Sequence, residues 1–203
     1  MRAWYSSRVP VAHSTVVLAL STLLRANSTA LYTPKCVAFC GTATARDLAY
    51  DLHVAKCKHP LGGRVHAGFL RRYDAIATSR RSTARVVTGF SLGSAMAALY
   101  AVDMLQRGQR IDHVILFASP RIGDDEFAKR YDALLGARTT RFQHAGDPIV
   151  RLPPRRLGYA HIGRPVTLHF DTPNVFNHDV RGYDRALGLQ RSYEDVVLRD
   201  PFA

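Results

Sequence analysis

A Gly-x-Ser-x-Gly pattern centred on Ser91 is the arrangement of residues with the clearest chemical meaning in this chain. It lies between a β-branched run, residues 84–90, and a segment with helical spacing, residues 92–107. A serine at a strand-to-helix turn has a cramped backbone, and glycines two residues away on either side let that turn close. The helix that follows would present amide donors where an oxyanion forms. The pattern therefore predicts a nucleophilic serine.

A serine hydroxyl needs a base to take its proton, and that base needs a carboxylate to orient it. Asp147 is the favoured acid, because it follows a predicted strand at residues 139–144 and stands in a loop where a side chain can project toward Ser91. Of the other aspartates downstream, four are expected to point away from the serine or to cap a helix. These are Asp103, Asp112, Asp124 and Asp125.

Several histidines could be the base. His178 stands just before the last predicted helix, where a loop can bring an imidazole over the edge of the sheet, and His161 begins a predicted strand. The remaining candidates are His113, His144 and His169. Spacing alone leaves the choice between His178 and His161 open.

The elements that must position these side chains alternate along the chain. Hydrophobic patterning predicts strands at 35–40, 84–90, 113–118, 139–144 and 161–170, and helices at 67–79, 92–107, 124–135 and 183–193, with a loop at 148–158. Such alternation predicts an α/β fold with a mostly parallel central sheet flanked by helices. We expect one domain over residues 1–203, in which residues 1–30 form an N-terminal helix or a signal-like segment, the helix being favoured.

Composition narrows the class of protein. With 203 residues, 47% of them hydrophobic, the chain can bury a core, which excludes wholesale disorder. The net charge of +12 is spread out, with no run of five like charges, so a nucleic-acid partner is not expected. Cys36, Cys40 and Cys57 form no Cys-x-x-Cys pair, so we expect buried thiols, no metal and no cofactor. Buried thiols favour an intracellular location over secretion, and no segment is apolar enough to span a membrane.

Seven segments, in order over residues 36–190, resemble the class 3 lipase family, the fungal-type triacylglycerol lipases within the α/β-hydrolases. They are VAFCGT at 37–42, VHAGFL at 65–70, TGFSLG at 88–93, FASPRIG at 117–123, HAGDPIVRLPP at 144–154, GYAHIG at 158–163, and His178 with Tyr183.

The resemblance implies a compact α/β-hydrolase fold with Ser91 as nucleophile, Asp147 as orienting acid and His178 as base. It implies an oxyanion hole formed by Thr42 and the backbone amide of Leu92. His161 and His66 fall on positions that are not catalytic in the family, so the resemblance resolves the choice of base that spacing leaves open.

The chain departs from the family pattern at three positions. Cys40 stands where the family usually has arginine, Phe90 replaces a histidine before the nucleophile, and Ser94 replaces a second glycine. None of these changes removes a reacting group. The lid region would be residues 43–54, a short segment without tryptophan, so small soluble esters suit the chain better than emulsified fat.

These observations predict a serine ester hydrolase, a lipase or carboxylesterase that acts on lipids or small esters through an acyl-enzyme. Two alternatives stay open: a catalytically silent basic binding module on the same fold, and a phospholipase that acts on anionic membranes. The expected partners are an ester or lipid substrate and, transiently, an anionic lipid surface.

Overall fold

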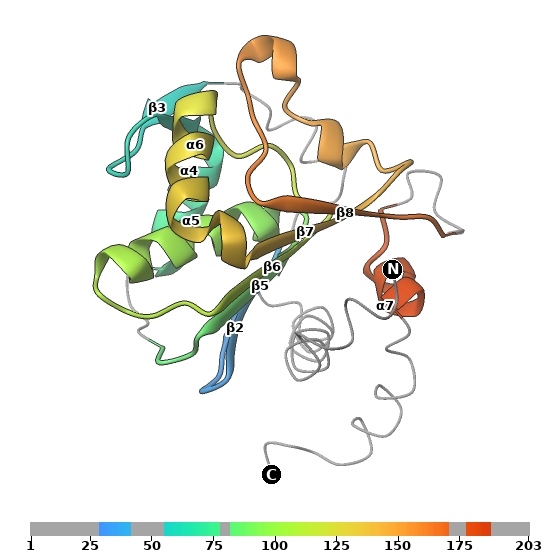
Figure 1. Cartoon of the computed structure of the whole chain (residues 1–203), viewed down its shortest axis with the longest axis horizontal. Coiled ribbons are helices and arrows are strands. Elements are labelled where there is room, and N and C mark those ends of the chain that lie inside the picture. Colours follow the sequence, from blue (N-terminus) through green and yellow to red (C-terminus); the bar gives the residue numbers. More distant parts are fainter. Residues whose placement is uncertain (1–28, 42–54, 78–81, 171–177, 188–203) are drawn as a thin grey trace.

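A six-stranded sheet forms the centre of the molecule, for which a computed structural model describes residues 29–41, 55–77, 82–170 and 178–187 (Figure 1). The strand order is β1-β2-β5-β6-β7-β8. Four neighbouring pairs run parallel and β1 pairs antiparallel with β2, so the predicted mostly parallel sheet is confirmed. The strands are β1 (Ala30–Tyr32), β2 (Cys36–Cys40), β5 (Val86–Phe90), β6 (His113–Phe117), β7 (Thr139–His144) and β8 (Arg164–Leu168).

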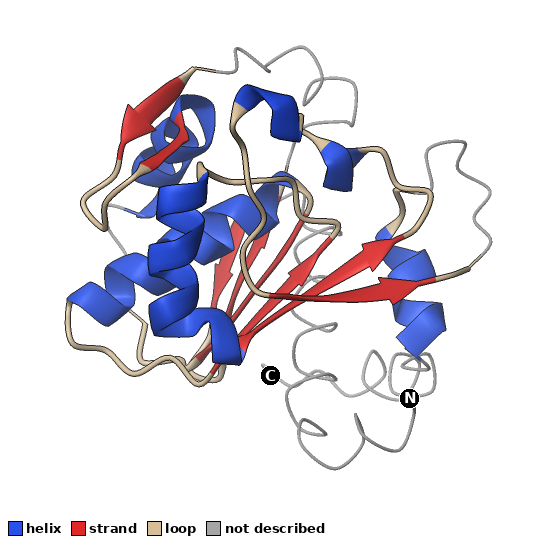
Figure 2. Cartoon of the chain, turned by 45° about the horizontal axis from the view of Figure 1, so that its top comes forward, coloured by secondary structure: helices blue, strands red, loops and turns tan. Residues whose placement is uncertain are grey.

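Three helices cover one face of this sheet and a fourth lies against the other (Figure 2). The first three, α4 (Ala67–Ala77), α5 (Leu92–Gln106) and α6 (Asp125–Leu135), each precede the next parallel strand. Because the strands are added in chain order and such crossovers are right-handed, all three helices fall on the same side. The fourth helix is α7 (Val180–Leu187), and a small hairpin of β3 (Lys56–Lys58) and β4 (Arg64–His66) precedes α4.

Both faces of the sheet are buried, which explains the apolar runs in its strands. Along β2, Val37 and Phe39 join the larger apolar cluster beneath α4, α5 and α6. The alternate residues of β2 face the smaller cluster, which Tyr183 of α7 completes. Every residue of β2 is buried.

Helix α5 is buried all round, although the spacing of residues 92–107 predicted only that this segment is a helix. Twelve of its 15 residues are buried, among them several alanines and one glycine. Small side chains allow the helix to lie close to the middle of the sheet, where it packs on β2 and β5. The turn before this helix, which carries Ser91, is therefore fixed by packing on several sides.

Most predicted elements are confirmed with small shifts at their ends. Asp124 caps α6 as expected, its side chain accepting a hydrogen bond from the amide of Phe127. The last helix begins at Val180 rather than 183, because Asp179 accepts hydrogen bonds from the amides of Arg181 and Gly182. The last strand is shorter than predicted, the predicted loop at 148–158 contains two 3-10 turns, η2 (Ile149–Arg151) and η3 (Arg155–Leu157), and β1 and the β3–β4 hairpin were not predicted.

The cysteines agree in part with expectation. Cys36 and Cys40 are buried free thiols, and burial raises the pKa of Cys36 to about 12 and that of Cys40 to about 11. Cys57 is also free but only half-buried, so the expectation of burial was wrong there. The proposed N-terminal helix lies outside the described residues. None of the helices in the described part of the chain is both long and apolar enough to cross a membrane.

Candidate active site

Ser91 occupies a strained turn between β5 and α5. Its φ of 58° and ψ of −127° lie in a region that residues with a side chain rarely adopt. The backbone amide of Ser91 donates to the carbonyl of Phe117 on the next strand at 2.9 Å, which ties the turn to the sheet. The serine is therefore held at the carboxyl end of the central strands, with 6% of its surface exposed.

The two glycines around Ser91 are required by close backbone contacts. A Cβ atom on Gly89 would lie 2.2 Å from the carbonyl oxygen of Gly93, and one on Gly93 would lie 2.2 Å from the carbonyl oxygen of Phe39. Ser94, one of the departures from the family pattern, donates to the carbonyl groups of Gly89 and Phe117, both at 2.7 Å. Its hydroxyl fixes the first turn of α5 to two strands, a contact that the sequence did not reveal.

Asp147 is fully buried in the loop that follows β7. Its Oδ1 accepts a hydrogen bond from the amide of Ile149 at 2.8 Å. The hydroxyl of Tyr183 donates to Oδ2 at 3.5 Å and accepts from the amide of His144 at 2.8 Å. These contacts leave Oδ2 of the carboxylate directed toward the loop before α7, where His178 lies.

His178 connects the other two side chains. Its Nδ1 lies 2.8 Å from Oδ2 of Asp147, and its Nε2 lies 2.8 Å from Oγ of Ser91. A carboxylate only accepts hydrogen bonds, so we place the imidazole proton on Nδ1, which leaves Nε2 to accept the proton of the serine hydroxyl. The ring is 7% exposed and packs against Phe90, with centroids 4.8 Å apart. The serine, imidazole and carboxylate thus lie in hydrogen-bonding sequence.

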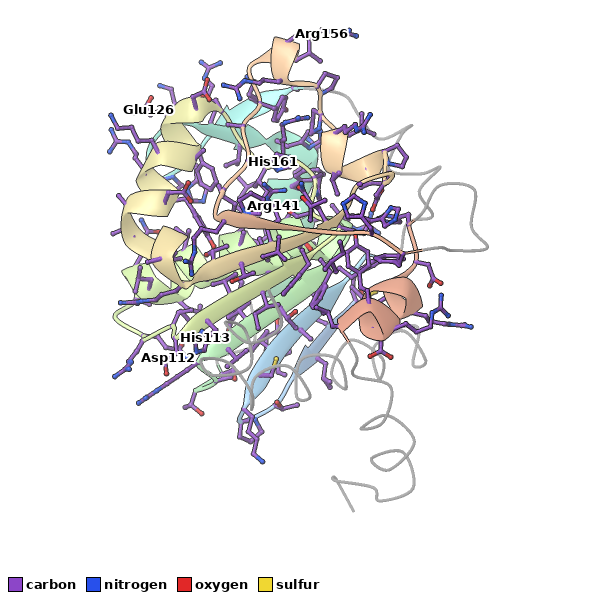
Figure 3. All side chains as sticks on the ribbon, turned by 45° about the vertical axis from the view of Figure 1, so that its right-hand side comes forward. Asp112, His113, Glu126, Arg141, Arg156 and His161 are labelled. Carbon is purple, nitrogen blue, oxygen red and sulfur yellow. The ribbon has the colours of Figure 1, made fainter. Side chains whose placement is uncertain are left out.

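The other histidines have different partners. His161 is directed away from the serine, since its Nε2 donates to the carbonyl of Val150 at 2.9 Å. Burial, reinforced by Arg141 and Arg121, lowers the pKa of His161 to about 3, so the ring is neutral (Figure 3). His66 accepts hydrogen bonds through Nδ1 from two amides at the start of α4, a structural role.

His113 begins β6 at the far end of the sheet, and His169 follows β8 on the surface. His144, although near Asp147, bonds to the carbonyl of Phe170 through Nε2 and accepts the amide of Gly146 through Nδ1.

The other aspartates are also engaged elsewhere. Asp103 accepts hydrogen bonds from Tyr73 and Arg107 on the α4–α5 side of the sheet. Asp112 pairs with arginines at the end of the strands opposite the serine (Figure 3). Asp124 and Asp125 belong to the cap and first turn of α6, as expected. The carboxylate that lies within hydrogen-bonding distance of Nδ1 of His178 is that of Asp147.

The expected oxyanion hole is described only in part, because Thr42 lies outside the described residues. Its neighbour Gly41 follows β2 and lies beside the start of α5: a Cβ atom built on Gly41 would be 3.5 Å from the amide nitrogen of Leu92. The first amides of a helix have no acceptor within it, so the amide of Leu92 is suited to a negative oxygen. Cys40, where the family usually has arginine, is a buried thiol and brings no cation to this position.

Metal-binding side chains do not gather in the described ranges. No group of three or more His, Cys, Asp or Glu there is placed to hold a metal ion. The groups that the structure does bring together at this edge of the sheet are the hydroxyl of Ser91, the imidazole of His178 and the carboxylate of Asp147.

A nucleophile turn at the carboxyl end of a parallel sheet, with helices on both faces, defines an α/β-hydrolase. Comparison with known proteins agrees, since the model of the family "Lipase (class 3)" matches residues 36–157. This chain belongs to the class 3 lipase family.

Relatives show the same affiliation. A secreted mono- and diacylglycerol lipase of Fusarium solani is 37% identical over 116 residues, covering 52% of this chain and 34% of that protein. A lipase of Rhizomucor miehei is 30% identical over 156 residues, which cover 68% of this chain and 43% of that lipase. The chain thus spans less than half the length of these relatives. The Fusarium enzyme is named as secreted, which does not favour the intracellular location expected from the cysteines.

A solved triacylglycerol lipase, described as having a catalytic centre formed by a serine protease triad, superposes with a TM-score of 0.58 at 27% identity. The match covers 66% of this chain and 58% of that one. This similarity confirms the α/β-hydrolase fold.

Proposed function

We propose that this chain is a serine ester hydrolase that cleaves carboxylic esters of lipids or small alcohols through an acyl-enzyme. The observation that carries the proposal is the pair of 2.8 Å contacts by which His178 joins Ser91 to Asp147. A serine hydroxyl on a strained turn, in contact with an oriented imidazole, is an activated nucleophile. Membership in the lipase family supports an ester as the substrate.

In the first half of the reaction, Oγ of Ser91 attacks the ester carbonyl carbon while Nε2 of His178 takes the hydroxyl proton. The carbonyl oxygen becomes an oxyanion, stabilised by the amide of Leu92 and, in our proposal, by Thr42. When the tetrahedral intermediate collapses, the carbon–oxygen bond to the alcohol breaks. His178 gives its proton to the leaving oxygen, and the acyl group stays on Ser91.

In the second half, water replaces the alcohol. His178 takes a proton from the water as its oxygen attacks the acyl carbon, and returns a proton to Oγ of Ser91 as the acid leaves. Asp147 holds the Nδ1 proton throughout and stabilises the imidazolium that forms in each half.

Initial rates on p-nitrophenyl esters of increasing acyl length test this proposal and define the acyl preference. We expect hydrolysis that Ser91→Ala reduces to the rate without enzyme, with unchanged circular dichroism. Ser82→Ala is the matched control, because the hydroxyl of this serine donates to the carbonyl of Thr33 and accepts from the amide of Ala84, before β5. Hydrolysis retained by Ser91→Ala would overturn the assignment, and a folded wild type without turnover would favour the silent binding module.

A further inference from the structure

The 3-10 turn η3 carries an unusual set of exposed side chains. Arg155 and Arg156 are both exposed, and Leu157 beside them is 42% exposed. Among the large apolar side chains that the structure describes, the only other exposed one is Leu134, at 46%. Figure 3 shows Arg156 at the outer tip of this turn. We call Arg155, Arg156 and Leu157 the η3 surface.

The η3 surface is held firmly in place. Nζ of Lys56 donates hydrogen bonds to the carbonyl groups of Leu157 and Gly158, at 2.9 and 2.8 Å. The same ammonium lies 4.7 Å from the ring centre of Tyr159, which is itself buried. Gly158 closes the turn with φ 71°, and a Cβ atom there would come within 2.9 Å of Nζ of Lys56. The projection of Leu157 from the protein is thus built into the fold.

The positive charge around η3 is not neutralised within the described part of the chain. Arg155, Arg156 and the nearby Arg151 form no ion pair with a described carboxylate. Arg121, which holds the preceding loop by donating to the carbonyl of Pro153, adds a further cation that Arg155 repels. Some exposed arginines elsewhere do have carboxylate partners, namely Arg107 with Asp103, Arg110 with Asp112, and Arg130 with Glu126, whereas others such as Arg64 and Arg164 form no ion pair with a described carboxylate.

The η3 surface belongs to the end of the molecule that carries the candidate active site. The chain runs from Asp147 through η2 directly into η3, and both turns lie beyond the carboxyl ends of the parallel strands (Figure 2). Ser91 is at that same end of the sheet, after β5. A flat surface that contacts η3 would therefore approach the molecule from the side of the reacting groups.

We infer that the η3 surface docks the protein on an anionic lipid surface. Leu157 would enter the apolar boundary of the lipid while Arg155 and Arg156 meet headgroup phosphates. The exposed leucine favours a lipid surface over a nucleic acid as the partner, because a lipid surface has an apolar region in which Leu157 can be buried and the charged backbone of a nucleic acid does not. The purpose that we assign to docking, the presentation of lipid esters to Ser91, rests on the proposed ester hydrolase function.

Sedimentation with vesicles tests the inference without requiring catalysis. The whole chain, carrying Ser91→Ala to prevent hydrolysis, is mixed with vesicles of phosphatidylcholine alone or with phosphatidylserine. We expect binding to the anionic vesicles that weakens at high salt. Removing both charges in Arg155→Gln/Arg156→Gln should weaken it roughly 25-fold, at about a fivefold factor per basic residue. Leu157→Ser should weaken it about tenfold.

Matched variants separate a specific surface from the general positive charge. Arg107→Gln/Arg110→Gln removes the same number of charges at the opposite end of the strands, and Leu134→Ser removes the other exposed leucine. Both control variants should bind the anionic vesicles as tightly as the protein with an intact η3 surface. Equal losses in the η3 and control variants would overturn the inference, as would binding to an oligonucleotide that depends on the arginines but is indifferent to Leu157→Ser.

Hydrolysis of a short soluble ester, measured with Ser91 intact, keeps the two proposals apart. The η3 variants should hydrolyse it at the wild-type rate, because η3 does not contact the reacting groups. Vesicle binding without any esterase activity would overturn the proposed function and leave the docking surface standing. Esterase activity with no preference for anionic vesicles would overturn the docking surface alone.

Discussion

Replacing Asp147 by asparagine should inactivate the enzyme by fixing the wrong tautomer of His178. The carboxylate accepts from the amide of Ile149 at Oδ1 and from Nδ1 of His178 at Oδ2, each at 2.8 Å. A backbone amide can only donate, so the single oxygen of asparagine must remain opposite Ile149. The side-chain NH₂ then faces Nδ1 of His178.

That arrangement forces His178 to accept at Nδ1 and to carry its proton on Nε2, 2.8 Å from Oγ of Ser91. An imidazole with a protonated Nε2 cannot take the serine proton. We expect kcat to fall about 10⁴-fold, the size of effect that this tautomer error causes in serine hydrolases, or about 5.5 kcal/mol in activation free energy. KM should change little, because Asp147 is fully buried and out of reach of the substrate.

Initial rates on a short p-nitrophenyl ester measure the effect, and thermal unfolding shows whether the variant folds. Asp132→Asn is the matched control: this aspartate also accepts a backbone hydrogen bond, from the amide of Gly163 at 2.7 Å, but lies on α6. It should keep wild-type kcat. A folded Asp147→Asn protein with kcat within tenfold of wild type would refute the role assigned to this carboxylate.

Three further predictions concern stability and positioning. The pKa of His161 is near 6.5 in the unfolded chain but about 3 in the folded protein, so on acidification the unfolded chain takes up a proton that the folded protein does not. Lowering the pH from 7.5 to 5 should therefore reduce the free energy of unfolding by about 2 kcal/mol, and His161→Gln should remove that loss. Gly93→Ala should destabilise the fold by about 3 kcal/mol or more in urea unfolding, because the new Cβ meets the carbonyl of Phe39. Tyr183→Phe should cost about 1–3 kcal/mol in unfolding free energy by leaving the amide of His144 without its acceptor, while kcat falls by less than about tenfold.

Each of these has a contradicting result. Glutamine can still donate to the carbonyl of Val150 but does not titrate. If His161→Gln loses as much unfolding free energy between pH 7.5 and 5 as the wild type, other groups cause the loss. Gly108→Ala is the control for Gly93: an added Cβ there meets nothing within 4 Å, and the positive φ alone should cost about 1 kcal/mol. Equal losses at both glycines would refute the steric argument. Unchanged stability in Tyr183→Phe would refute the role of its hydroxyl.

The sequence predicted the parallel sheet well because its strands are apolar runs bounded by turns and helices. It failed for β1 and the β3–β4 hairpin, since three residues carry too little periodicity to distinguish a strand from a loop. The sequence also did not show that α5 is buried all round. A helix rich in alanine shows no strong contrast between faces, and only its place in the middle of the sheet buries it.

The nucleophile turn could be predicted because its geometry depends on local residues, Gly89 and Gly93. The choice between His178 and His161 could not be made from spacing, because each ring's direction depends on a partner distant in the chain or on the packing of a loop. The resemblance favoured His178, and the structure brings His178 to Ser91. The contact of Phe90 with His178 joins residues 88 positions apart, and no sequence pattern predicted it.

The central claim is that the hydroxyl of Ser91 is a nucleophile activated by His178. Covalent labelling with a fluorophosphonate, followed by peptide mapping, tests this claim most directly. We predict one phosphonylated residue, Ser91, in the wild type, and labelling that is lost in Ser91→Ala and strongly slowed in His178→Ala. Attachment at another serine, or equal labelling rates with and without the His178 imidazole, would contradict the account.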